Sequence, residues 1–269
     1  MKNLFCKTLL ACAVTASMGF SSLAAAATVF PDFTVNEGFV PGANANVLTA
    51  DKITGNYVEE ITFKPTSASA GTFNVSLRWD AGQFVGTDGT QAVGSQLGLG
   101  SAGQVNQYGL YALYTGLGTY STSGAKTTFS FTPGGSLSIY LNPSSAANGP
   151  DLLIATGVPI SGEGTLDTSL TTCTGGTSGG AGINCGSFGA ASTIVLTEAG
   201  SQYFIEPNPF YEFAFQSGQL NNFAPTGTQI INGSLDVIFG NAVPEPASVA
   251  LLGLGLLGFA ASRRNTKKK

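Results

Sequence analysis

The chain has 269 residues, of which 43% are hydrophobic and only 10% charged, and it contains no histidine. Without histidine, the sequence lacks the most common general base and zinc ligand, and it cannot form a Ser-His-Asp or Cys-His catalytic arrangement. Residues 28–242 carry four basic and fourteen acidic side chains, a net charge of about −10. Such a charge repels phosphate backbones and argues against a nucleic-acid partner.

The first 27 residues predict a signal peptide. Two lysines lie near the start, residues 9–20 are largely apolar, and a run of alanines ends at Ala26 and Ala27. This order of a basic, an apolar and a small-residue segment is what a signal peptidase requires. We expect cleavage after Ala26 or Ala27, which leaves an extracellular domain over residues 28–242, within the usual length of one all-β unit.

Runs of β-branched and aromatic residues recur through this domain, and no window shows sustained helical periodicity. Gly, Ser and Thr separate the runs, as they do between strands. The predicted strands cover residues 57–63, 72–79, 108–114, 127–132, 136–141, 151–155, 193–197, 210–215 and 234–239. We predict an all-β fold, an antiparallel β-sandwich in preference to a barrel, with a jelly roll as one arrangement open to it.

Two of these runs predict a β-hairpin. In residues 127–132 and again in residues 136–141, apolar side chains alternate with hydroxyl side chains. Pro133, Gly134 and Gly135 stand between the runs, and these residue types are typical of a turn. The sequence therefore predicts that the two runs pair with each other.

Cys173 and Cys185 predict a disulfide. They are the two cysteines left after the signal peptide is removed, and they lie in a stretch rich in Gly, Ser and Thr. An exported pair with no third partner most simply forms one bridge. Closing a loop of this length stabilises the fold by about 3 kcal/mol in the loop-closure model.

Acidic side chains are the remaining candidates for a metal site. Asp80 and Asp88 belong to residues 80–91, a segment between strands that also offers amide and carbonyl oxygens of the kind that calcium prefers. Their spacing does not match an EF-hand, and Asp-Gly is also a common turn sequence. We favour a turn, with calcium binding as the alternative, and expect no cofactor.

Pairs of carboxylates leave open a second class of function, glycoside hydrolysis. The pairs are Glu59 with Glu60, Asp80 with Asp88, Glu163 with Asp167, and Glu206 with Glu212. Neighbours in a strand point to opposite faces, so Glu59 and Glu60 cannot flank one bond. The other pairs lie in turn-like segments. We predict no catalytic residues, and keep a secreted carbohydrate-active enzyme or carbohydrate-binding protein with an acidic site as the alternative.

Aromatic side chains could provide a platform for sugar rings. The candidates are Trp79, Tyr108, Tyr111, Tyr114 and Tyr120. By strand alternation, Tyr108 and Tyr114 point to one face while Tyr111 points to the other. Packing in the core is therefore the better interpretation for most of them.

Residues 243–269 form a three-part tail. Val243, Pro244, Glu245 and Pro246 make a stub that cannot continue a helix, an uncharged run follows, and five basic residues close the chain. The fifteen-residue run would reach about 22 Å as a helix, short of a hydrocarbon core of ~30 Å. The basic residues would stay on the cytoplasmic side. We expect transient insertion into the inner membrane, with a lasting single-span anchor as the alternative.

This tail resembles the PEP-CTERM sorting signal of Gram-negative bacteria. The resemblance implies that exosortase, a membrane protease-transpeptidase, recognises the stub and removes the tail. It also implies a location outside the cell or on its surface.

Segments of the extracellular domain resemble flocculation-associated PEP-CTERM proteins. The segments are residues 33–37, 46–57, 108–114, 200–204 and 209–211. The resemblance implies a surface protein without enzymatic activity in a bacterium that makes exopolysaccharide. The expected role is to associate with that polysaccharide when cells aggregate into flocs or biofilms.

Overall fold

The computed structural model describes residues 30–98, 107–143, 150–174 and 184–241. The predicted signal peptide with its cleavage site at Ala26 and Ala27, and the predicted stub Val243, Pro244, Glu245 and Pro246, lie outside these residues. Within the described ranges, no helix is both long enough and apolar enough to cross a membrane.

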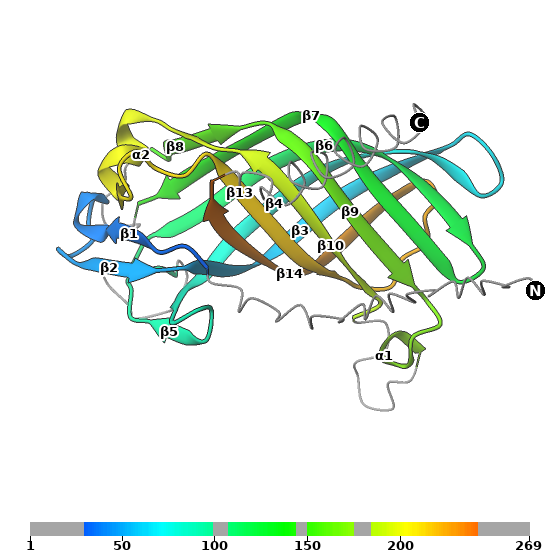
Figure 1. Ribbon diagram of the computed structural model, residues 1–269, viewed down its shortest axis with the longest axis horizontal. Helices are drawn as coiled ribbons and strands as arrows, with labels where there is room; N and C mark the ends of the chain where they lie inside the picture. The colour runs from blue at the N-terminus through cyan, green and yellow to red at the C-terminus, as the bar shows by residue number, and fades with distance from the viewer. Residues whose placement is uncertain (1–29, 99–106, 144–149, 175–183, 242–269) are drawn as a thin grey trace, which may run out of the picture.

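The described residues form mainly strands (Figure 1), and these strands are 2 to 17 residues long. In order they are β1 (Phe33–Asn36), η1 (Glu37–Phe39), β2 (Val47–Ala50), β3 (Lys52–Pro65), β4 (Ala70–Gly86), β5 (Gln91–Val93), β6 (Gly109–Ser123), β7 (Lys126–Asn142), β8 (Leu152–Gly157), β9 (Pro159–Asp167), α1 (Thr171–Thr174), β10 (Gly186–Thr193), β11 (Val195–Leu196), α2 (Glu198–Tyr203), β12 (Phe204–Glu206), β13 (Phe213–Leu220) and β14 (Thr228–Gly240).

Eight antiparallel strands close into a barrel. They follow the order β7-β6-β4-β3-β14-β13-β10-β9, and β9 pairs back with β7. The predicted all-β antiparallel fold is confirmed, and opposite walls share one core as the layers of a sandwich do. The sheet is nevertheless continuous, because the first half of β7 pairs with β9 and its second half pairs with β8.

Side chains alternate between the barrel interior and its outer surface. Along β4, for example, Phe73, Val75, Leu77 and Trp79 are buried while the residues between them are exposed. Small residues on one wall leave room for rings from another: a Cβ at Gly218 would lie 2.4 Å from the ring of Phe188. The interior is therefore a core packed with rings and aliphatic side chains, as in other small barrels.

The predicted hairpin at Pro133–Gly135 is wrong, because residues 126–142 form the single strand β7. Both halves pair with β6 instead of with each other: Thr132 faces Leu117 and Ser136 faces Thr115. The four-residue step on β7 opposite a two-residue step on β6 is a bulge. Gly134 and Gly135 have φ values of 123° and 97°, which glycine adopts without steric cost.

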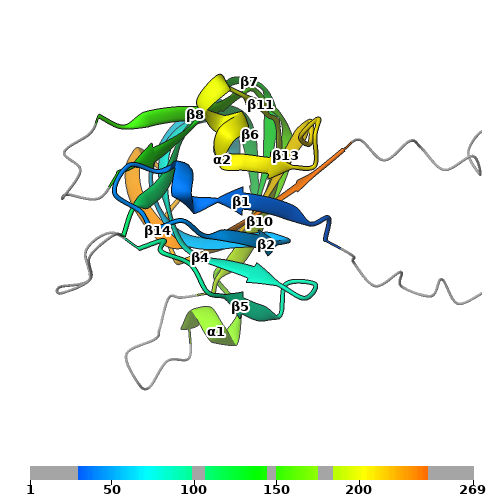
Figure 2. The same ribbon diagram turned by 90° about the vertical axis from the view of Figure 1, so that its left-hand side faces the viewer.

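Aromatic rings fill the two ends of the barrel. At one end, shown face-on in Figure 2, the small β12-β1-β2 sheet and α2 lie across the opening. There the ring of Phe33 packs edge-to-face against Phe204 and Phe239, at centroid distances of 5.8 and 5.2 Å. At the other end, Phe223 stacks on Phe63 at 6.1 Å.

A buried carboxylate ties together the end that carries α2. Glu37 accepts hydrogen bonds from Asn46 Nδ2 (2.6 Å), from Gln96 N (2.7 Å) and Nε2 (3.2 Å), and from the Tyr108 hydroxyl (3.1 Å). Tyr108 and Tyr203 share a further hydrogen bond of 2.7 Å. Burial raises the pKa of both tyrosines, so both remain protonated donors at neutral pH. Both carboxylate oxygens of Glu37 therefore have hydrogen-bond donors, and the role of this residue is structural.

Candidate functional site

The structure contains the predicted disulfide. Cys173 and Cys185 are both buried, and their sulfur atoms are 2.01 Å apart. The bridge lies at the end of the barrel opposite α2, where β9 leads into β10. It is a structural link, because it joins the two ends of the connection between neighbouring strands.

The two calcium candidates are not brought together. Asp80 lies on the outer face of β4 and accepts hydrogen bonds from Arg78, the shortest at 2.7 Å. About 20 Å of strand separates it from the end of β4. Asp88 is exposed in the turn at residues 87–90, where Gly89 N donates to Asp51. Among the described residues, no group of three or more acidic or cysteine side chains could hold a metal ion.

Three of the four acid pairs do not have the geometry of a glycosidase. Glu59 is buried inside the barrel while Glu60 is exposed on its outer wall, as strand alternation predicts. Glu163 and Asp167 lie four residues apart on β9, which corresponds to about 13 Å along a strand. The two carboxyl groups of a glycosidase lie about 5 to 9.5 Å apart. Asp167 also accepts hydrogen bonds from Ser169, and Glu206 and Glu212 are both exposed.

Four of the five aromatic candidates pack inside the molecule. Trp79, Tyr108, Tyr114 and Tyr120 all belong to the hydrophobic core. The ring nitrogen of Trp79 donates to the Leu235 carbonyl oxygen at 3.0 Å. Tyr111 points to the opposite face from Tyr108 and Tyr114, as predicted; this is the outer wall of β6, where its neighbours leave it only 8% exposed.

Tyr111 is the centre of a surface group that we call the Tyr111 cluster: Arg78, Asp80, Tyr111, Tyr140 and Asp151. Cross-strand pairing creates it, since Tyr111 in β6 faces Asp80 in β4 on one side and Tyr140 in β7 on the other. The rings of Tyr111 and Tyr140 stack at 5.1 Å with an interplanar angle of 15°. The Arg78 guanidinium carbon lies 4.1 Å from the centroid of the Tyr111 ring.

Hydrogen bonds hold the Tyr111 cluster in place. The Tyr111 hydroxyl donates to Asp151 Oδ2 at 2.7 Å, and Asn142 Nδ2 donates to Asp151 Oδ1 at 2.6 Å. Desolvation, together with the bond to Asp151, raises the pKa of Tyr111 to about 12, so the hydroxyl remains a donor at neutral pH. The hydrogen bonds that Arg78 donates to Asp80 are the main reason that the pKa of Arg78 is raised.

The Tyr111 cluster has the chemistry of a carbohydrate contact. The side chains of Arg78 and Asp80 are 52% and 58% exposed, and Tyr140 is half-buried. Their donors and acceptors match sugar hydroxyl groups, and an aromatic ring with a polar rim provides both an apolar and a wet surface. Sequence reasoning missed Arg78, Tyr140 and Asp151. Only Tyr140 could have been found from the local pattern. In the run 136–141 it alternates with apolar residues, which predicts that its ring points to the outer face of the strand.

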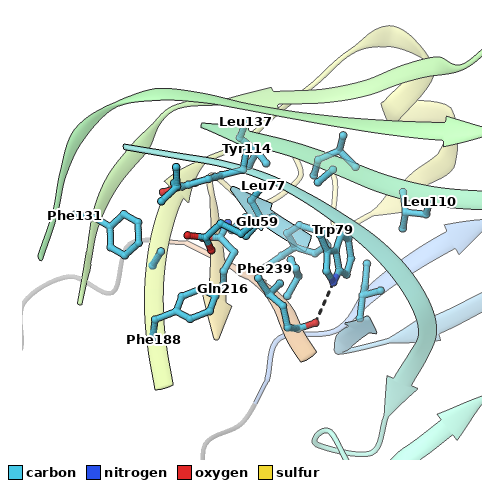
Figure 3. A pocket seen from close by; sticks show the side chains of 18 of the residues that line it. Glu59, Leu77, Trp79, Leu110, Tyr114, Phe131, Leu137, Phe188, Gln216 and Phe239 are labelled. Carbon is cyan, nitrogen blue, oxygen red and sulfur yellow. Dashed lines mark hydrogen bonds between the residues drawn. The ribbon is translucent and has the colours of Figure 1, made fainter. Parts of the chain in front are cut away.

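A second group of polar atoms lies inside the barrel (Figure 3). Glu59, Tyr114 and Gln216 line a cavity of about 40 Å³ whose other walls are apolar and aromatic. Glu59 is only 6% exposed. Burial raises its pKa to about 7. Sequence reasoning predicted that Glu59 and Glu60 point to opposite faces but did not identify Glu59 as buried. The available signal was that Glu59 shares a face with Tyr57, Ile61 and Phe63.

Comparison with known families finds a PEP-CTERM protein-sorting motif at residues 242–264. The match includes the predicted stub Val243, Pro244, Glu245 and Pro246. No curated protein and no solved structure matches the chain significantly. The motif marks the chain as an exported, cell-surface protein of Gram-negative bacteria that exosortase processes.

Proposed function

We propose that this protein is a non-enzymatic component of the extracellular matrix that associates with exopolysaccharide and holds cells together in flocs or biofilms. The sorting motif at residues 242–264 is the observation that carries the proposal, because it sends the barrel to the cell surface. The five segments that resemble the flocculation-associated PEP-CTERM protein PepA support the same role. We infer that cleavage occurs near Pro244–Glu245–Pro246 after transient insertion into the inner membrane.

The Tyr111 cluster is the proposed contact with the polysaccharide. A sugar ring can pack on the half-buried ring of Tyr140, while Arg78, Asp80 and Asp151 offer hydrogen bonds at its edge. The guanidinium group adds an attraction for acidic sugars. On the rest of the acidic surface, divalent cations could bridge protein carboxylates to an acidic polysaccharide.

Deleting the gene tests the role in aggregation. We expect the deletion strain to export its polysaccharide but to settle poorly, and complementation with the intact gene to restore flocs. Flocs that form normally without the gene would refute the proposal. Mass spectrometry of the exported chain should show an end near Pro246, without Leu251 and the basic residues that follow.

A Tyr140→Ala variant tests the contact surface. Loss of one aromatic contact of about 0.5 to 1.5 kcal/mol should weaken binding to the purified polysaccharide by roughly twofold to twelvefold. Phe215→Ala is the matched control, since Phe215 is also an outward ring, 41% exposed, on the distant strand β13. Equal binding by both variants would exclude the Tyr111 cluster and leave the role in aggregation untouched.

A further inference from the structure

The interior of the barrel contains polar atoms that lack hydrogen-bond partners. The Tyr114 hydroxyl and the Gln216 Oε1 atom are buried without a partner among the described residues. The carboxylate of Glu59 lines the same cavity, and desolvation is the cause that raises its pKa, with no hydrogen bond from any described residue beside it. Unpaired polar groups in an apolar interior cost free energy, so three of them around one cavity call for a common partner.

A partner for all three groups must carry hydrogen-bond donors, and a positive charge on it would also neutralise the Glu59 carboxylate. A carboxylate and an amide oxygen are acceptors, and a phenol can accept as well as donate. The described basic side chains do not supply the charge: Lys52 pairs with Asp236 at 3.1 Å, Arg78 pairs with Asp80, and Lys64 and Lys126 are exposed.

We propose that this cavity is a binding site for a small primary ammonium ion, in which the Glu59 carboxylate pairs with the charge and Tyr114 and Gln216 accept further N–H hydrogen bonds. The apolar walls, which include Leu77 and Leu137, suit a short aliphatic chain on the nitrogen (Figure 3). This site is independent of the proposed contact with polysaccharide.

Two features limit the size of the ion. A water molecule needs roughly 10 to 15 Å³ by this measure of volume, so about 40 Å³ accommodates about three non-hydrogen atoms. A second cavity of about 20 Å³ lies beyond Glu59, Phe131 and Phe188, which line both cavities. The rings of Phe131 and Phe188 therefore end the first cavity, and ethylammonium is a probe of suitable size.

Binding depends on pH through Glu59. The titratable groups that face Glu59 are Tyr57 and Tyr114. Burial is the main cause that raises the pKa of both tyrosines, and the charge of Glu59 is the second cause. The pKa of Tyr114 is raised to about 12. Glu59 is thus the group that changes charge near neutrality. With a pKa of about 7, its ionised fraction rises from about 3% at pH 5.5 to about 90% at pH 8. Ethylammonium should bind roughly 30-fold more tightly at pH 8 than at pH 5.5.

Calorimetry and thermal melting of the exported protein test the site. At pH 8, ethylammonium chloride should bind with one-to-one stoichiometry and raise the melting temperature. Tetramethylammonium has the same charge but no N–H donor. At equal ionic strength, neither tetramethylammonium nor sodium should bind at the site or raise the melting temperature. Stabilisation by either of these ions equal to that by ethylammonium, or the absence of any effect of ethylammonium at pH 8, would overturn the proposal.

Two neighbouring glutamates provide a matched pair of variants. E59Q should abolish the binding of ethylammonium, while E60Q, which changes the adjacent carboxyl on the outer wall, should leave it unchanged. Y114F should weaken it roughly threefold to tenfold. Binding that survives in E59Q would overturn the proposal even if that variant melts at a different temperature, because binding and stability are measured separately.

Discussion

Replacing Glu59 by glutamine should change how the stability of the barrel depends on pH. Glu59 lies in an apolar interior, where burial raises its pKa from 4.5 to about 7. Each unit of pKa shift corresponds to about 1.4 kcal/mol, so the ionised carboxylate costs the folded state about 3 kcal/mol. Glutamine has a similar shape and no charge to desolvate.

The direction of the effect follows from where the proton is held more tightly. The folded protein retains the proton of Glu59 at pH values where the unfolded chain has lost it. The contribution of Glu59 to stability is therefore most favourable below pH 4.5 and falls as the pH rises to about 7. Above that window, the penalty of about 3 kcal/mol remains constant.

Denaturant unfolding of the exported protein between pH 4.5 and pH 8.5 measures this pH-dependent contribution of Glu59 to the unfolding free energy. We expect the difference in unfolding free energy between Glu59→Gln and the unchanged protein to grow by about 3 kcal/mol across the range, in favour of the variant. Glu60→Gln should follow the unchanged protein, because Glu60 is exposed to solvent. Parallel curves for Glu59→Gln and the unchanged protein would refute the reasoning that the carboxyl is desolvated and unpaired.

Three further substitutions test the structural features. Changing Cys173 and Cys185 to serine should lower the unfolding free energy by about 3 kcal/mol, measured against the oxidised protein; no loss would contradict loop closure as the role of the bridge. Glu37→Gln should cost about 2 kcal/mol, because four donors lose a charged acceptor, and an unchanged denaturation midpoint would argue against it. Gly218→Ala should lower the unfolding free energy by about 1 to 3 kcal/mol, because the new methyl group would overlap the ring of Phe188. Gly94→Ala is the control: a Cβ there has no atom within 4 Å, so the unfolding free energy should change by less than about 0.5 kcal/mol. Equal effects of the two substitutions would contradict the packing of Gly218 against Phe188.

The fold was predictable where strands carry their own signal. β3, β4 and β14 alternate apolar and polar residues, and the sequence located each of them. β9 and β10 were missed because Gly, Ala, Ser and Thr make up nearly half of β9 and almost all of β10, and these residues give a weak strand signal alone. Their small side chains become favourable only when rings from other strands fill the space. The sequence also did not predict that the barrel closes, because closure depends on the pairing of β9 with both β10 and β7.

The candidate sites were predictable only one strand at a time. Alternation predicted that Tyr111 points away from Tyr108 and Tyr114 and that Glu59 and Glu60 point to opposite faces, because a strand has a period of two. The stacking of Tyr111 on Tyr140 depends on the register between β6 and β7, which no local pattern sets. Gly134 and Gly135 in β7 led to the wrong prediction of a hairpin for a related reason. A bulge and a turn use the same residue types, and only the pairing with the neighbouring strand distinguishes them.

The described domain begins and ends on the same side. Phe33 of β1 and Phe239 of β14 are in ring contact at the end opposite the disulfide. Only two residues separate Gly240 from Val243, so the stub begins within about 11 Å of the barrel along the chain. If the tail inserts into the inner membrane as we propose, this short tether would hold the α2 end of the barrel close to the lipid surface.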